Sequence, residues 1–144
     1  VARGLAGRIL TRFEDKGLRI VGMKLQKIPL ALARRHYAEH QGKPFYPGLL
    51  RFITSGPVVL LALEGKSAVA VCRKRLGATF GSEALPGTIR GDFGLSDRFN
   101  LVHGSDSVRT AWREIALYFH KNELIRVPRA ELRWHYDFSD GTVR

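Results

Sequence analysis

The stretch PVVLLALEG, residues 57–65, is a continuous apolar run that ends at a glycine. A run of this kind is typical of a β-strand that is buried on both of its faces. Upstream, the segment LRIVGMKLQKI (18–28) alternates Val21, Met23 and Leu25 with other residues, and this period of two predicts a second strand. Strands with such apolar faces need a covering layer, which the remaining chain should supply as helices packed on a sheet.

The segments around these two strands show the apolar periodicity of helices. Helices are predicted over 5–16, 30–40, 45–55, 67–77 and 107–119. The apolar NLVH (100–103) predicts a further short strand, whereas 78–99 has no regular period and predicts a long loop, the kind of segment that often carries function. The alternation of strands and helices therefore predicts an α/β sandwich.

The helix predicted over 107–119 has an apolar face. It places Val108, Trp112, Ile115 and Phe119 on one side.

The length of 144 residues suits one domain with a substantial core. We expect residues 1–137 to form this domain and 138–144 to form a loose C-terminal tail. No apolar run is long enough to span a bilayer, and the first residues lack the pattern of a signal peptide. The single cysteine, Cys72, cannot form an internal disulfide, which fits a reducing compartment and predicts a cytoplasmic location.

The charge is the unusual feature of the composition. Lys and Arg number 24 against 13 Asp and Glu, which gives a formal net charge of +11. Such a field favours polyanions, including nucleotides and nucleic acid. The basic residues are scattered, however, and we interpret most of them as solvated helix faces, so nucleic acid is a possible but secondary partner.

Two apparent motifs are rejected. The segment EGKSA (64–68) lacks the earlier glycine of a phosphate-binding P-loop, since that position holds Leu60. His36 and His40 have the spacing of two metal ligands on a helix, but no carboxylate or cysteine joins them in the sequence. We therefore predict surface imidazoles and assign no metal-ligating residue.

The long loop carries groups suited to an oligophosphate. Arg90 lies between Gly87 and Gly91, and Arg73 and Thr79 lie just upstream. Guanidinium groups bind phosphate oxygens through two parallel hydrogen bonds, and glycine permits close approach of the backbone. Arginines on loops are also common without any ligand, and these residues alone leave both interpretations open.

The segment NLVHGSDS (100–107) places His103 at the end of the predicted short strand, with Gly104 leaving one side of the ring open. Ser105 and Ser107 offer capping groups at a helix start, where anionic oxygen binds well. An imidazole is nucleophilic when an acceptor orients its second nitrogen, and Glu114 on the following helix is a candidate acceptor. The alternative is a histidine that only caps the helix or fills the core.

Taken together, HYAEH with KPFYPGL, then SGPVV, PGTIRGDF and NLVHGSDSV, are similar to the nucleoside diphosphate kinase family. The order and the intervals match from VARGL to about Asp137. The resemblance implies a ferredoxin-like fold, with four antiparallel strands and helices packed on the sheet. It also implies a homo-oligomer, for which we favour a hexamer over a tetramer.

The same resemblance implies a ping-pong transfer of phosphate. His103 would take the γ-phosphate of a nucleoside triphosphate, with ATP as the expected donor, and pass it to a nucleoside diphosphate. Glu114 would orient the imidazole, Ser105 would support it, and Tyr37 would lie near the transferred group. Together with Mg²⁺, the nucleotide would be held by Phe45 and Leu49 at the base, Arg73, Thr79 and Arg90 at the phosphates, and Asn100 at the ribose.

The sequence departs from the family pattern at three places. The family's first strand and its Lys-Pro-Asp-Gly motif should lie just before Val1, so we expect the natural polypeptide to begin upstream. Phe80 and Gly81 stand where Asn-Pro is usual, in a loop that helps to hold the oligomer. Asp97 stands where a valine would form the other wall of the base slot.

Two rival functions follow from these observations. One is a catalytically weakened nucleotide- or nucleic-acid-binding protein on the same fold, which the net charge and the missing lysine favour. The other is a histidine phosphocarrier that serves one protein partner, which would accept phosphate on His103 without returning it to free nucleotides.

Overall fold

The computed structural model describes residues 1–96 and 99–125. Predictions that concern Asp97 and the tail from 138 to 144 lie outside these residues. The helices and strands are α1 (Ala6–Glu14), β1 (Arg19–Lys27), α2 (Leu30–His36), α3 (Tyr46–Thr54), β2 (Pro57–Glu64), α4 (Ala68–Leu76), α5 (Ile89–Phe93) and α6 (Val108–Tyr118). Short 3₁₀ turns are η1 (Ala38–His40), η2 (Gly81–Glu83) and η3 (Lys121–Glu123).

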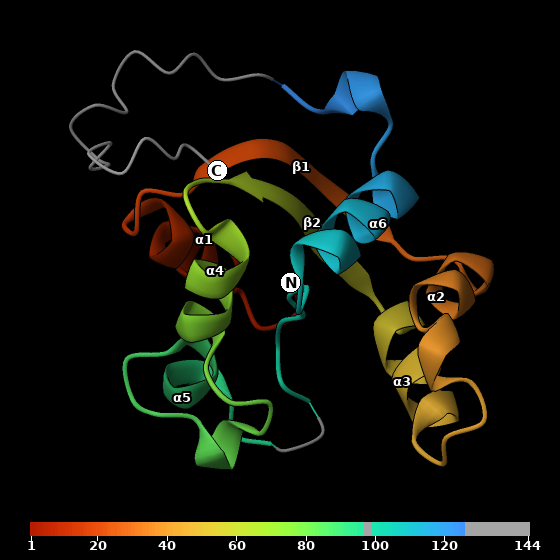
Figure 1. The fold of residues 1–144 in the computed structure, drawn as a ribbon. Helices are drawn as coiled ribbons and strands as arrows, with labels where there is room; N and C mark the ends of the chain where they lie inside the picture. The colour runs from red at the N-terminus through yellow and green to blue at the C-terminus, as the bar shows by residue number, and fades with distance from the viewer. Residues whose placement is uncertain (97–98, 126–144) are drawn as a thin grey trace.

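The two strands form an antiparallel sheet. Their register runs from the pair Arg19 and Glu64 to the pair Lys27 and Pro57, with one irregularity near Gly22. Helices α1, α4 and α5 lie toward one end of this ribbon and α2 and α3 toward the other, with α6 between them (Figure 1). The prediction of helices packed on an antiparallel sheet is confirmed.

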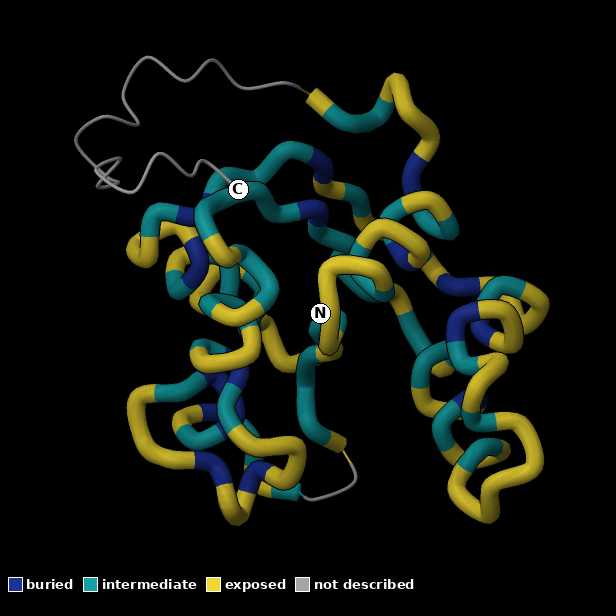
Figure 2. Tube along the Cα trace, viewed as in Figure 1, coloured by how far each residue is buried: buried dark blue, intermediate teal, exposed yellow. Residues whose placement is uncertain are grey.

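Strand β2 is packed on both faces, as its unbroken apolar run predicts. Leu61 and Leu63 pack against a first cluster that is centred on Phe13 of α1, Leu76 of α4 and Ile89 of α5. Residues on the opposite face pack against a second cluster built from Ile28, Ala33 and Leu50. Buried positions therefore lie on both sides of the ribbon, and further ones lie within it and around α5 (Figure 2).

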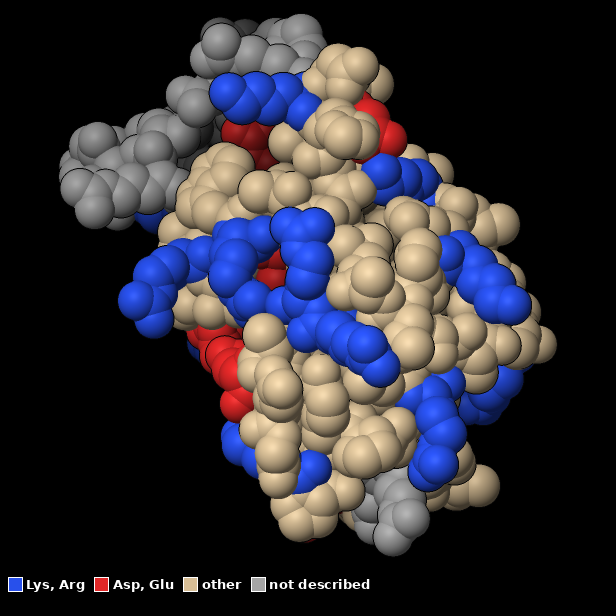
Figure 3. Space-filling view, turned by 90° about the vertical axis from the view of Figure 1, so that its right-hand side faces the viewer, with Lys and Arg blue, Asp and Glu red and all other residues tan. Residues whose placement is uncertain are grey.

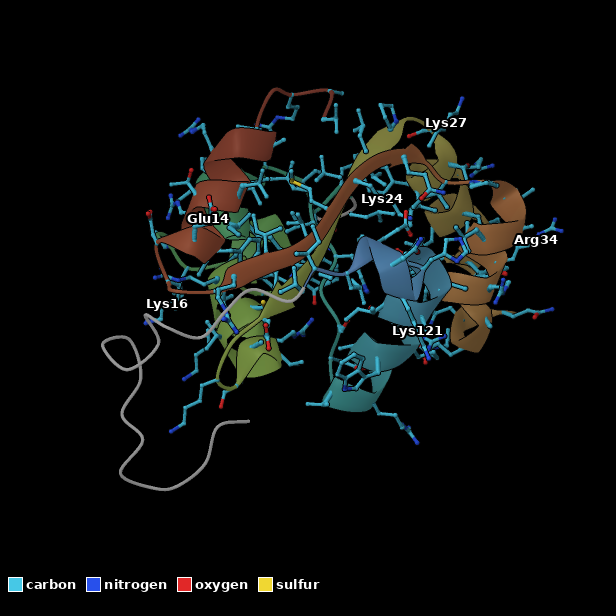
Figure 4. All side chains as sticks on the ribbon, turned by 90° about the horizontal axis from the view of Figure 1, so that it is seen from above. Glu14, Lys16, Lys24, Lys27, Arg34 and Lys121 are labelled. Carbon is cyan, nitrogen blue, oxygen red and sulfur yellow. The ribbon has the colours of Figure 1, made fainter. Side chains whose placement is uncertain are left out.

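Strand β1 is an edge strand with an exposed apolar stripe. Met23 and Leu25 are 57% and 64% exposed. On the other face, a Cβ at Gly22 would lie 2.9 Å from Leu124 and 3.1 Å from Phe119, so the glycine helps this C-terminal segment to pack closely on the strand. Lys24 extends from β1 toward the same segment (Figure 4), where its Nζ donates to both carboxylate oxygens of Glu123 at 2.8 Å.

The predicted strand at 100–103 is wrong. These residues form an irregular segment, and Leu101 has a positive φ of 67°. Instead of a strand neighbour, the guanidinium group of Arg90 accompanies the segment and donates to the carbonyls of Asn100 and Val102. One side chain thus takes over hydrogen bonds that a sheet would otherwise provide.

The segment 78–99 is more ordered than its pattern suggested. It contains η2 and the short helix α5, whose first turn is capped by Thr88: its hydroxyl accepts the N–H of Gly91 at 3.1 Å. A helix of five residues is too short to show an apolar period, so the periodicity could not reveal it. Gly81 of η2 packs against the backbone of Gly94, where a Cβ would lie 2.7 Å from the carbonyl oxygen.

Helix α6 is present as predicted, and its apolar side is buried at Phe119, which is 8% exposed, but not at its start. Val108 and Trp112 are 63% and 65% exposed, while Glu114 is only 8% exposed. A hydrophobicity pattern places a carboxylate on the solvent side, because burial of a charge is costly without partners. The partners of Glu114 come from another part of the chain.

A groove of about 690 Å³ runs along β2 and the segment 99–105. Its lining is mainly apolar, with His103, Ser105 and Glu114 at one side. In the part of the chain that the structure describes, β2 pairs with no strand but β1. The strand expected upstream of Val1 stays a prediction. No helix within the described ranges has the length and apolarity to cross a membrane.

Candidate active site around His103

The structure brings three of the predicted catalytic residues together. The Nε2 atom of His103 lies 3.1 and 3.2 Å from the two carboxylate oxygens of Glu114. The hydroxyl of Ser105 donates to one of these oxygens. Ser107 caps α6 by accepting the N–H of Thr110 at 3.1 Å, and Glu114 follows two helical turns later on the side that faces His103.

The backbone at His103 is held by packing and by Arg90. The Nη2 atom of Arg90 donates to the carbonyl of Val102 at 2.7 Å. Gly104 lies against Leu76, and a Cβ at this position would collide with that side chain. Gly104 therefore also allows the backbone beside His103 to pack closely against Leu76. The His103 side chain itself is 48% exposed and accessible to a ligand.

Glu114 is ionised in this setting. Burial acts to raise the pKa of its carboxyl, but the hydrogen bond and charge of His103 and the hydroxyl of Ser105 outweigh burial, and the pKa lies below its ordinary value. An ionised carboxylate can only accept hydrogen bonds. We infer that Nε2 of His103 carries the ring proton, which leaves a lone pair on Nδ1.

His36 is a site residue that the sequence reasoning placed wrongly. It was predicted to be a surface imidazole, yet it is only 3% exposed. Its ring centroid lies 4.7 Å from that of His103, and its Nδ1 lies 3.8 Å from Glu114 Oε1. Burial, followed by repulsion from His103, lowers the pKa of His36 to about 4, so the ring is neutral near pH 7. The sequence held one signal of this burial: His36 lies about one helical turn after Ala33, so the two residues share the buried face of α2.

Tyr37 lies beside this pair. Its ring is perpendicular to that of His103 at a centroid distance of 6.3 Å. Burial, with a smaller contribution from Glu114, raises the pKa of Tyr37 to about 12. The phenol is therefore available as a hydrogen-bond donor throughout the physiological range.

This pKa gives a direct test. We expect the tyrosinate absorbance of Tyr37, measured as wild type minus Tyr37→Phe, to be absent at pH 10 and to rise near pH 12. Because the folded-state pKa exceeds the ordinary value of 10.0, the stability that the protonated phenol contributes is lost as the pH rises through this window. A difference spectrum that titrates close to pH 10 would contradict the buried placement.

Arg90 is placed differently from the prediction. It is 4% exposed, and burial, with repulsion from Arg73, lowers its pKa. Its Nη1 donates to the carbonyls of Gly77 at 3.0 Å and Ala78 at 3.3 Å. With the bonds to Asn100 and Val102, four of its five N–H donors are used. The paired fork expected for a phosphate is therefore occupied, and one N–H remains.

Three other predicted phosphate and ribose residues lie nearby. Thr79 and Asn100 are joined, since Asn100 Nδ2 donates to the Thr79 carbonyl at 3.1 Å. Arg73 lies in the last turn of α4 and is exposed. The structure thus gathers Arg73, Thr79, Arg90 and Asn100 at the segment that leads into His103.

The two predicted base contacts are less closely joined to this cluster. Phe45 is 55% exposed at the start of α3, next to His40 and Lys43. Leu49 lines the same groove as His103 and Asn100, whereas Phe45 does not line it. An unpredicted contact between Phe52 of α3 and Phe99, with ring centroids 5.0 Å apart, links α3 to the segment before His103.

Comparisons with known proteins agree with one another. A sequence profile described as "Nucleoside diphosphate kinase" matches residues 1–124. A protein of that name from Thermus thermophilus is 58% identical over 125 residues, which cover 87% of this chain and 91% of the relative. One from Synechococcus is 51% identical over 137 residues, covering 95% and 92%. A halophilic nucleoside diphosphate kinase from Halobacterium salinarum, solved in complex with CDP, superposes with a TM-score of 0.91 at 48% identity over 94% of this chain and 91% of that chain.

Proposed function

The chain belongs to the nucleoside diphosphate kinase family, and we propose that His103 is the residue through which it transfers phosphate. As a member of this family, the chain has a ferredoxin-like α/β fold and transfers phosphate between nucleotides. The observation that supports the choice of His103 is its contact with Glu114: Nε2 faces the carboxylate, and the ring is half-exposed.

The proposed transfer has two half-reactions. Nδ1 of His103 attacks the γ-phosphorus of a nucleoside triphosphate, an N–P bond forms, and the P–O bond to the nucleoside diphosphate breaks. A terminal phosphate oxygen of a second nucleoside diphosphate then attacks the phosphohistidine and restores the lone pair of Nδ1. The imidazole gains positive charge in the first step, and the Glu114 carboxylate beside Nε2 stabilises that charge. Ser105 holds this carboxylate in place.

The nucleotide would span the mouth of the groove. Phe45 offers an exposed aromatic face to the base, which suits any base because each has a π face, and Leu49 supports it. Asn100 would contact the ribose 3′-hydroxyl, and Tyr37 would donate to the transferred phosphate. Because the donors of Arg90 are largely used, we assign the main phosphate contacts to Arg73 and Thr79, with Arg90 contributing its remaining N–H.

We expect Mg²⁺ to enter this site bound to the phosphates of the nucleotide. Mg²⁺ takes oxygen ligands and commonly keeps several waters. Glu114 is already bonded to His103 and Ser105, and Asp106 is an exposed carboxylate near Arg73. This donor set offers no preformed cage of carboxylates among the described residues, so we expect phosphate oxygens and water to supply most ligands. When bound, the ion neutralises phosphate charge, while the residues above orient the nucleotide.

The function has a direct test. Incubation with ATP labelled at the γ-phosphate should place an acid-labile, alkali-stable label on the protein, because a phosphoramidate bond has that stability. Addition of an unlabelled nucleoside diphosphate should then move the label to the corresponding triphosphate. A label that stays on the protein would indicate a phosphocarrier instead, and no label at all would contradict the proposal.

We also propose self-association, with a hexamer favoured over a tetramer. The apolar stripe of Met23 and Leu25 lies exposed on the edge strand β1, and edge strands pair readily with another chain. The cytoplasmic location stays a prediction. It is consistent with nucleotide substrates and with a single cysteine, which fits a reducing compartment.

Charge on the stripe should disrupt the assembly. We expect Met23→Lys with Leu25→Lys to lower the mass measured by light scattering, because burial of each apolar side chain contributes about 2 kcal/mol. Leu85→Lys is the matched control, since Leu85 is 74% exposed on a loop. An unchanged mass in the double variant would place the interface elsewhere.

The rival of a nucleic-acid-binding protein with lost catalysis is not favoured, since the family matches are kinases throughout. Several basic side chains adjoin one another across the middle of the face in Figure 3, and others stand apart from them. Nucleic-acid binding remains a secondary prediction.

A further inference from the structure

We propose that His36, His103 and Glu114 form a binding site for a divalent transition-metal ion, with Zn²⁺ as the best match, and that this ion competes with phosphorylation of His103. The site is separate in kind from the magnesium of the nucleotide, because it uses nitrogen ligands and needs no phosphate. Metal binding does not depend on the proposed function, since it can be measured without nucleotide, whereas the competition with phosphorylation rests on that function.

The donor set is the first argument. One ligand atom from each of the three residues lies within 4.8 Å of the other two. Two imidazole nitrogens and one carboxylate oxygen are a common protein ligand set for zinc with an open fourth position. Hard cations such as Mg²⁺ prefer an all-oxygen set, so the two nitrogens select against them.

The second argument is an unsatisfied nitrogen. Nδ1 of His36 is buried and has no hydrogen-bond partner among the described residues. Its neighbour Glu114 Oε1 is 3.8 Å away, which is too far for a hydrogen bond. Buried polar atoms in folded proteins are nearly always paired, so an orphaned ring nitrogen that faces a carboxylate indicates a missing partner. A metal ion between the two atoms would satisfy both.

One ligand distance already fits a zinc site, whereas the others must shorten, since the three ligand atoms span up to 4.8 Å. Tetrahedral zinc with bonds of about 2.0 Å separates its ligand atoms by about 3.3 Å. Nε2 of His103 already lies 3.1 Å from Glu114 Oε1. The gap of 3.8 Å between His36 and Glu114 must close by about half an ångström, within the range of a side-chain rotation.

The surroundings suit a bound ion. The hydroxyl of Ser105 donates to Glu114 Oε2 and would orient the carboxylate from behind, as outer hydrogen bonds do in metal sites. The exposed side of His103 leaves the fourth position open to water. Arg113 lies 3.9 Å from Glu114 Oε1 and opposes a cation, but its side chain is 44% exposed and can turn into solvent.

The consequence is inhibition. The ion would replace the proton on Nε2 of His103 and withdraw electron density from the ring, so that Nδ1 becomes a weaker nucleophile. Zinc should therefore slow the uptake of phosphate even when Mg²⁺ and ATP are in excess.

The test uses the complete chain and Co²⁺ as a spectroscopic probe for Zn²⁺. We expect wild type to give the intense visible absorption of four-coordinate Co²⁺, which Zn²⁺ then displaces. His36→Gln should weaken Co²⁺ binding by about 100-fold, because one of three protein ligands is lost. The matched control His40→Gln removes a neighbouring imidazole that belongs to no such cluster in the described part of the chain and should bind like wild type.

Circular dichroism checks that His36→Gln is folded, and Glu114→Gln repeats the test if it is not. Equal Co²⁺ affinity in wild type and in the folded ligand variant would overturn the proposal, as would a weak six-coordinate spectrum in wild type. A four-coordinate spectrum without any phosphate uptake would support the metal site while contradicting the proposed function.

Discussion

Replacement of His103 by alanine should lower the rate of phosphate transfer between nucleotides by at least about 10⁴-fold. The reason is that the half-exposed ring of His103 is hydrogen-bonded to the Glu114 carboxylate, whereas His36, the other histidine near that carboxylate, is buried. In the proposed mechanism Nδ1 of His103 is the attacking atom in the first half-reaction and carries the phosphate in the second, so its loss removes the covalent intermediate altogether. The measurement is the uptake of label from ATP and its return to a nucleoside diphosphate.

The same variant should remain folded. The ring of His103 is half-exposed, and Glu114 keeps the hydroxyl of Ser105 as a donor, so the free energy of unfolding should fall by only about 1–2 kcal/mol. His40→Ala is a suitable control, because it removes an imidazole near Phe45 without touching Glu114. Appreciable label on the folded His103→Ala protein would show that another residue accepts the phosphate.

Replacement of Arg90 by methionine should lower the free energy of unfolding by about 3–5 kcal/mol, because several carbonyls would lose a charged hydrogen-bond donor. Its guanidinium group donates to four backbone carbonyls, those of Gly77, Ala78, Asn100 and Val102. Methionine fills a similar volume but leaves these oxygens without the donor. Urea unfolding followed by tryptophan fluorescence would measure the change.

Arg73→Met provides the contrast for Arg90. Arg73 is exposed, so we expect its replacement to change the free energy of unfolding by no more than about 0.5 kcal/mol. It should raise the KM for nucleotides, since we assign a main phosphate contact to Arg73. If Arg90→Met and Arg73→Met had the same free energy of unfolding, the stabilising role that we assign to the hydrogen bonds of Arg90 would be wrong.

The two strands illustrate what could be predicted locally. An unbroken apolar run specified β2, and alternation specified β1, because side chains on a strand point to opposite faces in turn. The helices that cover the sheet followed from their own apolar periods. The short helix α5 escaped, since five residues cannot display a period, and the strand expected at 100–103 failed because its hydrogen-bond partner is the side chain of Arg90.

The functional site likewise has parts that the sequence predicted and parts that it did not. The motif around His103 was conspicuous in the sequence because its chemistry needs a nucleophile, small neighbours and a helix start in one short segment. The role of Arg90 was only half predicted: its guanidinium was expected to face a ligand, but it mainly binds the protein's own carbonyls. Nothing in the local pattern distinguishes these two uses of the same charge.

The sequence by itself determined the two strands, the longer helices, the proposed nucleophile and the family resemblance, because these depend on residues close together along the chain. Only the tertiary structure decided that His36 is buried against His103 and that Glu114 faces inward from α6. Those facts depend on which faces of α2 and α6 meet. A polar side chain is buried in such an interface only where residues from distant segments of the chain pair with it. The local hydrophobic period does not show where those residues lie.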